Sequence, residues 1–130
     1  MEPLTEQFQN TVKSLLIRHQ SILDILSKGQ EASARVNRAV VKSVTSCGCL
    51  AIEAHKKPIP DNATLYDLKE LLDSNLQGKL CDNCRDTIEG ELGKQLFYIA
   101  AMANTLGISL DNVVKREMDK LSTLTIFNMT

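Results

Sequence analysis

The sequence lacks a block of like charge, a long apolar run and a basic leader. Lysine and arginine number 15 against 16 acidic residues, a net charge of −1, so no electrostatic footprint supports nucleic-acid binding. Nowhere do 18 apolar residues run together, and the start Met1 to Glu6 has no basic segment followed by an apolar core. These absences predict a cytoplasmic protein that binds neither nucleic acid nor a membrane.

The sequence also lacks strand-like alternation, internal repeats and low-complexity segments. Apolar residues instead recur at steps of three, four or seven, which is typical of amphipathic helices. A chain of 130 residues is long enough for one core and too short for two ordinary domains. We therefore predict an all-α fold, a single domain over residues 1–130 arranged as an antiparallel bundle of four or five helices.

The expected helices follow from stop signals and caps. A first long helix is predicted within residues 1–29, and a second over residues 30–56, where prolines end it. A capping box from Thr64 to Asp67 opens a short third helix that is expected to close at Gly78. The remaining signals predict a fourth helix from Cys81 to Gly107 and a fifth capped by Ser109, while the structure of the tail, residues 123–130, is left open.

The cysteines are few and are spaced in pairs. They occur as Cys47-Gly48-Cys49 and Cys81-x-x-Cys84, with none left over. Two thiol pairs separated by a helix-sized segment form a four-sulfur metal pattern, and in a reducing cytosol such thiols favour metal over disulfides. The four cysteines are therefore predicted to be metal ligands, with zinc as the expected ion.

Three other interpretations of these cysteines remain open. An iron–sulfur cluster uses the same ligands, the Cys81-x-x-Cys84 spacing also suits redox exchange, and buried cysteines can be apolar core residues. Geometry also argues against a shared ion, because residues two apart on a continuous helix point about 200° apart. Cys47 and Cys49 can therefore meet only if Gly48 breaks the helix.

The run from Glu91 to Ile108 (ELGKQLFYIAAMANTLGI), followed by Asp111 and Lys120-Leu121, resembles the MazG-like all-α nucleoside triphosphate pyrophosphohydrolases. The resemblance covers about a third of the chain. It implies a MazG-like helical bundle that associates as a homodimer or homotetramer. It also implies magnesium bound by acidic pairs on two helices, with water attacking between the α and β phosphorus atoms.

The residues that match this family's motifs are incomplete. Glu91 matches the first acid of its "ExxD" motif, but Lys94 replaces the aspartate. On the other metal-binding helix, Thr45, Ser46 and Cys49 stand where the resemblance places glutamates. Because magnesium needs hard oxygen ligands, we expect its site to be degraded.

The expected function is a non-catalytic or strongly altered binding or regulatory module that is stabilised by metal. Any nucleotide is expected near Glu91, Lys94 and Lys120, the last matching the family's lysine. One alternative is a divergent magnesium-dependent pyrophosphohydrolase with Glu53, Glu89 and Glu91 as candidate catalytic residues. A second alternative is a thiol redox sensor.

Overall fold

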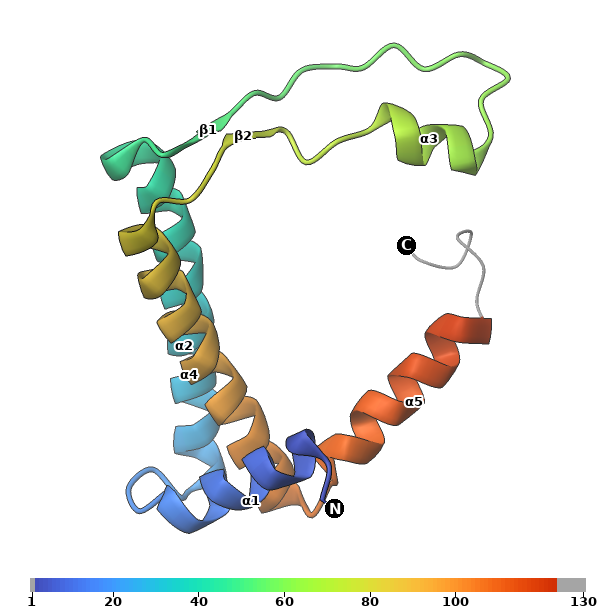
Figure 1. Ribbon diagram of the computed structural model, residues 1–130. Helices are drawn as coiled ribbons and strands as arrows, with labels where there is room; N and C mark the ends of the chain where they lie inside the picture. Colours follow the sequence, from blue (N-terminus) through green and yellow to red (C-terminus); the bar gives the residue numbers. More distant parts are fainter. Residues whose placement is uncertain (1, 124–130) are drawn as a thin grey trace.

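The structure is a computed structural model, and it describes residues 2–123. The described residues are 69% helical, with one two-stranded sheet (Figure 1). This confirms a mainly helical fold. None of the helices in residues 2–123 is long and apolar enough to cross a membrane. In chain order the elements are α1 (Leu4–Leu15), α2 (Ile22–Lys42), a π-helical turn η1 (Ser43–Cys47), β1 (Leu50–Ile52), α3 (Leu65–Leu71), β2 (Leu76–Gly78), α4 (Asp82–Leu106) and α5 (Leu110–Thr123).

Helices α2 and α4 lie antiparallel and side by side and form one side of the molecule (Figure 1). The two helices are in contact at Gly29, where a Cβ would lie at an ordinary contact distance of 3.8 Å from the Cβ of Tyr98. Near the C-terminal end of α4, helix α1 crosses the pair, and the buried core joins all three helices through Val12, Ile25, Ala100 and Ala101. Two of these four core residues are alanines, so the core of the single chain is small.

The expected first long helix over residues 1–29 is wrong. Helix α1 ends at Leu15, and α2 begins at Ile22 after a connection that contains His19 at φ 57°. The Ser21 hydroxyl accepts a hydrogen bond from the Leu23 amide and caps α2. Gly29, expected as a helix end, lies inside α2 and next to Tyr98 of α4.

The expected second helix over residues 30–56 is wrong at both ends. Its residues continue α2, and the helical path stops at Cys47 rather than at the prolines. Beyond it lies a strand pair that the sequence did not predict, with Leu50 opposite Gly78 and Ile52 opposite Leu76. Strands of three residues are too short to show an alternating pattern, and each finds its partner across more than twenty residues.

The later caps agree better with expectation. Thr64 and Asp67 form the complete capping box at the start of α3, although that helix ends at Leu71 rather than at Gly78. Helix α4 ends where Gly107 adopts φ 69°. The Ser109 hydroxyl accepts from the Asn112 amide at 3.2 Å and so caps α5 as expected. Of the tail, residues 124–130 lie outside the described residues.

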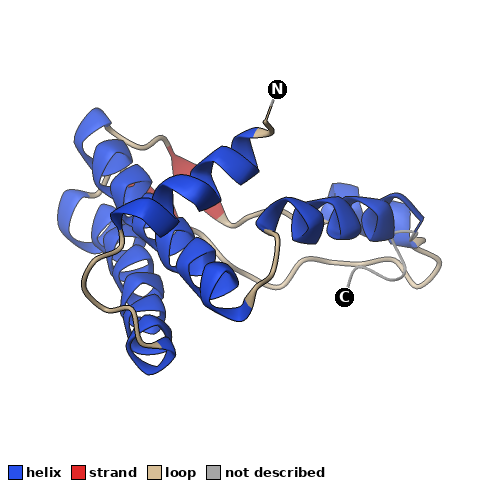
Figure 2. Cartoon of the chain, turned by 90° about the horizontal axis from the view of Figure 1, so that it is seen from below, coloured by secondary structure: helices blue, strands red, loops and turns tan. Residues whose placement is uncertain are grey.

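Two segments extend away from the paired helices. The first, which we call the arm, comprises residues 50–78 and carries α3 beyond the end of the pair (Figure 1). The second is α5, which diverges from α4 in both views (Figures 1 and 2). Neither α3 nor α5 has a fully buried residue, and apart from Leu110, which packs against the core, the apolar side chains of α5 are exposed in the single chain.

Candidate metal centre

The four cysteines meet where the arm leaves and rejoins the paired helices. Their Sγ atoms all lie within 4.8 Å of one another. Cys47 ends η1, Cys49 precedes β1, and Cys81 caps the N-terminus of α4 one turn before Cys84. Two cysteine pairs that are far apart in sequence thus converge into one cluster. Among residues 2–123, these four cysteines are the group of side chains that could hold a metal ion.

Gly48 removes the geometric objection to a shared site. It adopts φ 78°, a left-handed conformation that ends the helical path directly after Cys47. Its amide donates to the Ser43 carbonyl at 2.9 Å and closes the π-helical turn. Cys49 is therefore no longer on the helix, and both thiols of the first pair reach the same point.

Gly78 allows β2 to pass directly beside the first cysteine pair. It adopts φ 89°, and a Cβ built there would lie 2.4 Å from the carbonyl oxygen of Cys49. Atoms cannot approach this closely, so a side chain at residue 78 would push the strands apart. The sequence had presented Gly78 as a helix end; its role in positioning Cys49 depends on a contact across nearly thirty residues.

Ser43 lies beside the cysteine cluster and stabilises the turn between Cys47 and Cys49 through its hydrogen bonds. It is fully buried, and its hydroxyl donates to the Ala39 carbonyl at 3.1 Å. Its own carbonyl accepts from the Gly48 amide and lies 3.8 Å from the Cys49 sulfur, which can donate to it as a thiol. Because serine is common on exposed helix surfaces, no sequence signal marked this residue.

The thiols have very different acidities. The Cys84 amide donates to the Cys81 sulfur at 3.4 Å and, with the Cys84 side chain, lowers the pKa of Cys81 to about 7. The Ser43 hydroxyl acts to lower the pKa of Cys84, but the neighbouring Cys81 sulfur and burial outweigh it and raise that pKa to about 12. One thiol thus ionises readily, and its negative charge opposes ionisation of the next. A cation would relieve this repulsion.

One sulfur pair of the cluster has the spacing expected around a single tetrahedral ion. Ligands at a Zn–S distance of about 2.3 Å lie about 3.8 Å apart along the edge of a tetrahedron. The Cys47 and Cys81 sulfurs are 3.8 Å apart, and all four cysteines are free. A disulfide would require about 2.05 Å. The cluster therefore has the donor set and the size for one soft metal ion.

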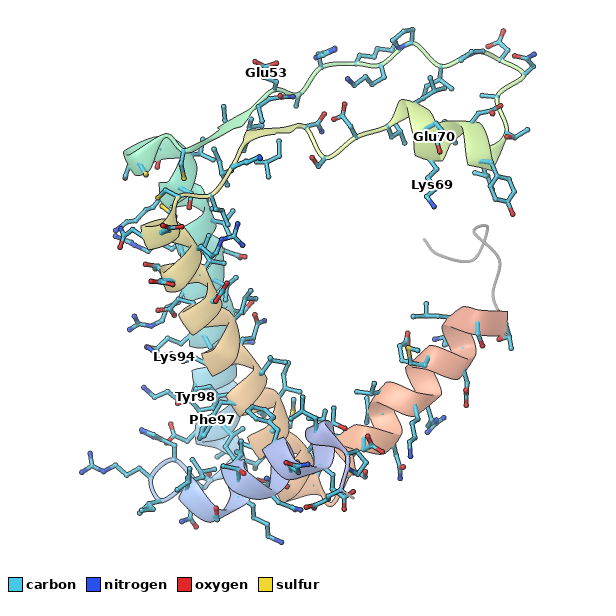
Figure 3. All side chains as sticks on the ribbon, in the orientation of Figure 1. Glu53, Lys69, Glu70, Lys94, Phe97 and Tyr98 are labelled. Carbon is cyan, nitrogen blue, oxygen red and sulfur yellow. The ribbon has the colours of Figure 1, made fainter. Side chains whose placement is uncertain are left out.

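The candidate catalytic acids do not form a comparable group. Glu53 follows β1 on the arm, where its amide donates to the Asn75 carbonyl at 2.8 Å, and Figure 3 places it beyond the end of the paired helices. Glu89 and Glu91 are two apart on α4, so their side chains point about 200° apart. Within the described single chain, these three carboxylates do not converge on one ion.

The candidate nucleotide-binding residues are divided between two helices. Glu91 and Lys94 lie a turn apart on α4 with their charged atoms 3.9 Å apart, and Lys94 lies along the outer side of the pair (Figure 3). Lys120 lies near the end of α5, which diverges from α4. The single chain thus brings Glu91 and Lys94 together and leaves Lys120 apart.

The Glu91 carboxylate also has one buried oxygen without a hydrogen-bond partner among the described residues.

Comparison with known protein families, with curated proteins and with solved structures gave no match for this chain.

Proposed function

We propose that this chain is a metal-stabilised binding or regulatory module, in which one zinc ion held by the four cysteines fastens the arm to the paired helices. The convergence of four sulfurs within 4.8 Å carries the proposal. Three of the four cysteines are partly buried, and the fourth, Cys47, is exposed. Four protein ligands leave no open position for substrate, which is typical of a structural rather than a catalytic zinc site.

Zinc fits this donor set better than the competing metals. Thiolates are soft ligands that magnesium and calcium avoid. A [4Fe–4S] cluster binds each thiolate to a different iron and a [2Fe–2S] cluster binds two thiolates to each iron, so thiolates on different irons lie farther apart than ligands of one ion. The convergence of all four sulfurs within 4.8 Å of one another therefore supports a mononuclear centre.

The expected energetic effect is large. Structural zinc sites contribute apparent binding energy of roughly 10 to 16 kcal/mol near neutral pH, coupled to folding. The net stability of an ordinary domain is about 5 to 15 kcal/mol. Because the core of this chain is small, we propose that the ion is required for an ordered junction between α2, the arm and α4.

The MazG-like origin and the cytoplasmic location belong to this proposal. The ELGKQLFYIAAMANTLGI run and the pairing of α2 with α4 support a scaffold of that kind. The placement of Cys49 where the resemblance puts a glutamate, and of Lys94 in place of an aspartate, supports a change of ligand chemistry from oxygen to sulfur. A reducing compartment would keep the four thiols available for the ion.

Elemental analysis tests the metal centre. Protein purified without added metal is expected to contain one zinc per chain by mass spectrometry of the metal, and Cys81→Ser is expected to lose it. Substitution with cobalt should give the visible bands of tetrahedral thiolate coordination. Metal-free protein with four titratable thiols would contradict the proposal.

A thiol redox sensor is the second candidate function. The lowered pKa of Cys81, about 7, and the 3.8 Å approach of the exposed Cys47 favour it. Thiol titration before and after treatment with hydrogen peroxide tests it. Reversible loss of two thiols in metal-free protein, with a Cys47 to Cys81 linkage in the peptide map, would support the sensor over a permanent zinc site.

The hydrolase alternative has its own test. Purified protein incubated with magnesium and each nucleoside triphosphate is expected to release no pyrophosphate above background, because the candidate acids lie apart in the chain. Release at enzyme-like rates that disappears in Glu91→Gln would contradict the non-catalytic proposal, whatever the zinc content.

A further inference from the structure

The four cysteines of the cluster belong to different parts of the fold. Cys47 is the last residue of η1, which continues α2, and Cys81 is the N-cap of α4. Cys84 lies in the first turn of α4, whereas Cys49 lies beyond the Gly48 break and leads directly into β1. The Cys47 and Cys81 sulfurs can therefore connect the two paired helices, and Cys49 is the ligand at the start of the arm.

Apart from the cysteines, few contacts hold the base of the arm to the paired helices. Leu50, which is 6% exposed, is the one buried residue of the arm, residues 50–78. Within the described part of the chain, β1 and β2 pair only with each other. The Cys49 sulfur lies within 4.8 Å of the other three sulfurs. An ion shared by all four sulfurs therefore links the arm to both helices, and its loss would free the base of the arm.

Cys47 is the cysteine that an oxidant in solution reaches first. It is exposed, whereas Cys49, Cys81 and Cys84 are partly buried. Oxidation of cysteine follows thiolate character and exposure. Zinc holds all of its cysteine ligands as thiolates, so charge does not distinguish the four sulfurs. Exposure does distinguish them, and it selects Cys47.

The Cys81 sulfur is placed to complete a disulfide with Cys47. The two sulfurs are 3.8 Å apart and come from the ends of two neighbouring helices. A bond between them would remove two of the four ligands. The remaining pair, Cys49 and Cys84, is too few for a closed tetrahedral zinc site. Zinc binding and this disulfide therefore exclude each other.

From these observations we infer that oxidation releases the zinc centre: hydrogen peroxide joins Cys47 to Cys81, expels the ion and frees the base of the arm while α2 and α4 stay linked. The inference rests on the proposed zinc site. The Cys47 thiolate attacks one peroxide oxygen, the O–O bond breaks, and hydroxide leaves with the electron pair. The Cys81 thiolate then attacks the Cys47 sulfur, the S–O bond breaks, and a second hydroxide leaves. Two thiolates lose two electrons, one peroxide gains them, and Zn²⁺ passes to water with its charge unchanged.

The oxidised chain differs from a chain that has lost zinc to a chelator. The disulfide still joins the end of η1 to the start of α4. The Arg85 amide, which donates to the Cys81 carbonyl at 2.9 Å, therefore stays protected after oxidation. Cys49 has no such link once the ion has left. The Glu53 amide, which donates to the Asn75 carbonyl at 2.8 Å within the arm, therefore loses protection.

Peroxide titration of the full, zinc-loaded chain tests the inference. The zinc content is measured first. One molar equivalent of hydrogen peroxide is then expected to release one zinc per chain to a zinc-binding dye and to leave a Cys47 to Cys81 link in the peptide map. Dithiothreitol and added zinc should restore the starting state. Hydrogen-exchange mass spectrometry of the oxidised chain should show faster exchange at Glu53 and retained protection at Arg85.

Two cysteine substitutions form a matched pair. Cys47→Ser and Cys49→Ser each remove one thiol of the first pair, so each chain keeps three thiolate ligands and is tested with zinc in excess. Cys49→Ser retains Cys47 and Cys81, and it should form their disulfide at about the wild-type rate. Cys47→Ser lacks the exposed sulfur and should consume peroxide at least about tenfold more slowly. Helical circular dichroism checks that both variants are folded.

The possible failures of the inference and of the zinc site are distinguishable. One zinc per chain that stays bound during the peroxide titration would overturn the inference and leave the zinc site intact. The same holds for a disulfide between another pair of cysteines, for Cys47→Ser reacting as fast as the wild type, and for an arm that stays protected after the zinc is lost. A chain that binds no zinc at the outset would overturn the proposed function and this inference together.

Discussion

At the scale of single residues, Gly78 is the position where the smallest chemical change should have the largest effect. Gly78→Ala would place a Cβ 2.4 Å from the Cys49 carbonyl oxygen and would force a left-handed φ on alanine. We expect a loss of about 1 to 3 kcal/mol in the free energy of unfolding, with weaker zinc binding, because Cys49 must move. Denaturant unfolding and competition with a zinc-binding dye measure the two effects.

Gly90→Ala is the matched control for this substitution. Gly90 lies within α4, and a Cβ there would have no atom within 4 Å. Alanine is favoured over glycine inside a helix by about 1 kcal/mol, so this variant should be equally or more stable and should bind zinc as the wild type does. Equal behaviour of the two alanine variants would show that the contact between β2 and Cys49 is unimportant.

At the scale of elements, Gln9 fixes the corner between α4 and α5. It is 8% exposed; its side-chain amide donates to the Ile108 carbonyl and accepts from the Leu110 amide, both at 2.7 Å. Gln9→Ala would remove both hydrogen bonds from two partly buried backbone groups, so we expect about 1 kcal/mol of destabilisation. Hydrogen exchange should accelerate most at the start of α5.

Asn10→Ala provides the comparison at this corner. Asn10 is exposed, and its side chain donates to the Glu2 carboxylate near the chain start. We expect a change within about 0.5 kcal/mol and unaltered exchange in α5. A similar loss in both variants would mean that α1 as a whole, rather than the Gln9 amide, determines the stability of the corner.

The arm provides the second test at this scale. Removing zinc with a strong chelator should release the base of the arm, because the strands β1 and β2 are only three residues long and pair only with each other. Amides of the strand pair, including that of Glu53, should lose protection in hydrogen-exchange mass spectrometry. The core around Ala100 and Ala101 should keep its protection. Uniform exchange before and after chelation would argue against a fastening role for the ion.

At the scale of the whole molecule, zinc affinity should depend steeply on pH. Cys84, with a pKa of about 12, keeps its proton at neutral pH without metal, and Cys81, with a pKa of about 7, is partly protonated below that value. Zinc must displace these protons, so its affinity should rise with pH, by at least about tenfold per pH unit between pH 6 and 8. Chelator competition at several pH values measures the slope, and a flat profile would contradict thiolate ligation.

The sequence predicted the parts of this molecule that depend on local chemistry. The Thr64 capping box, the Gly107 helix end and the Ser109 cap are read from residues a few positions apart, and each was found. The convergence of the two cysteine pairs also followed from their spacing. The same spacing predicted that Cys47 and Cys49 could meet only if Gly48 breaks the helix, and Gly48 does end the helical path.

The parts that were missed depend on distant contacts. The strand pair exists because Leu50 to Ile52 finds a partner in Leu76 to Gly78, and neither segment has a strand pattern of its own. Gly29 was expected as a helix end, but it lies inside α2, a helix that packs along its length against α4. The buried role of Ser43 likewise appears only when Cys49 and Cys84 are placed around it.

The strand pair has a consequence for engineering. The Glu53 amide donates to the Asn75 carbonyl at 2.8 Å, so the polypeptide departs and returns at neighbouring points. Residues 54–74 therefore form a connection whose two ends lie next to each other. A short hairpin turn could replace it without altering the course of the paired helices, and a foreign peptide or a whole inserted domain could be accommodated at the same place.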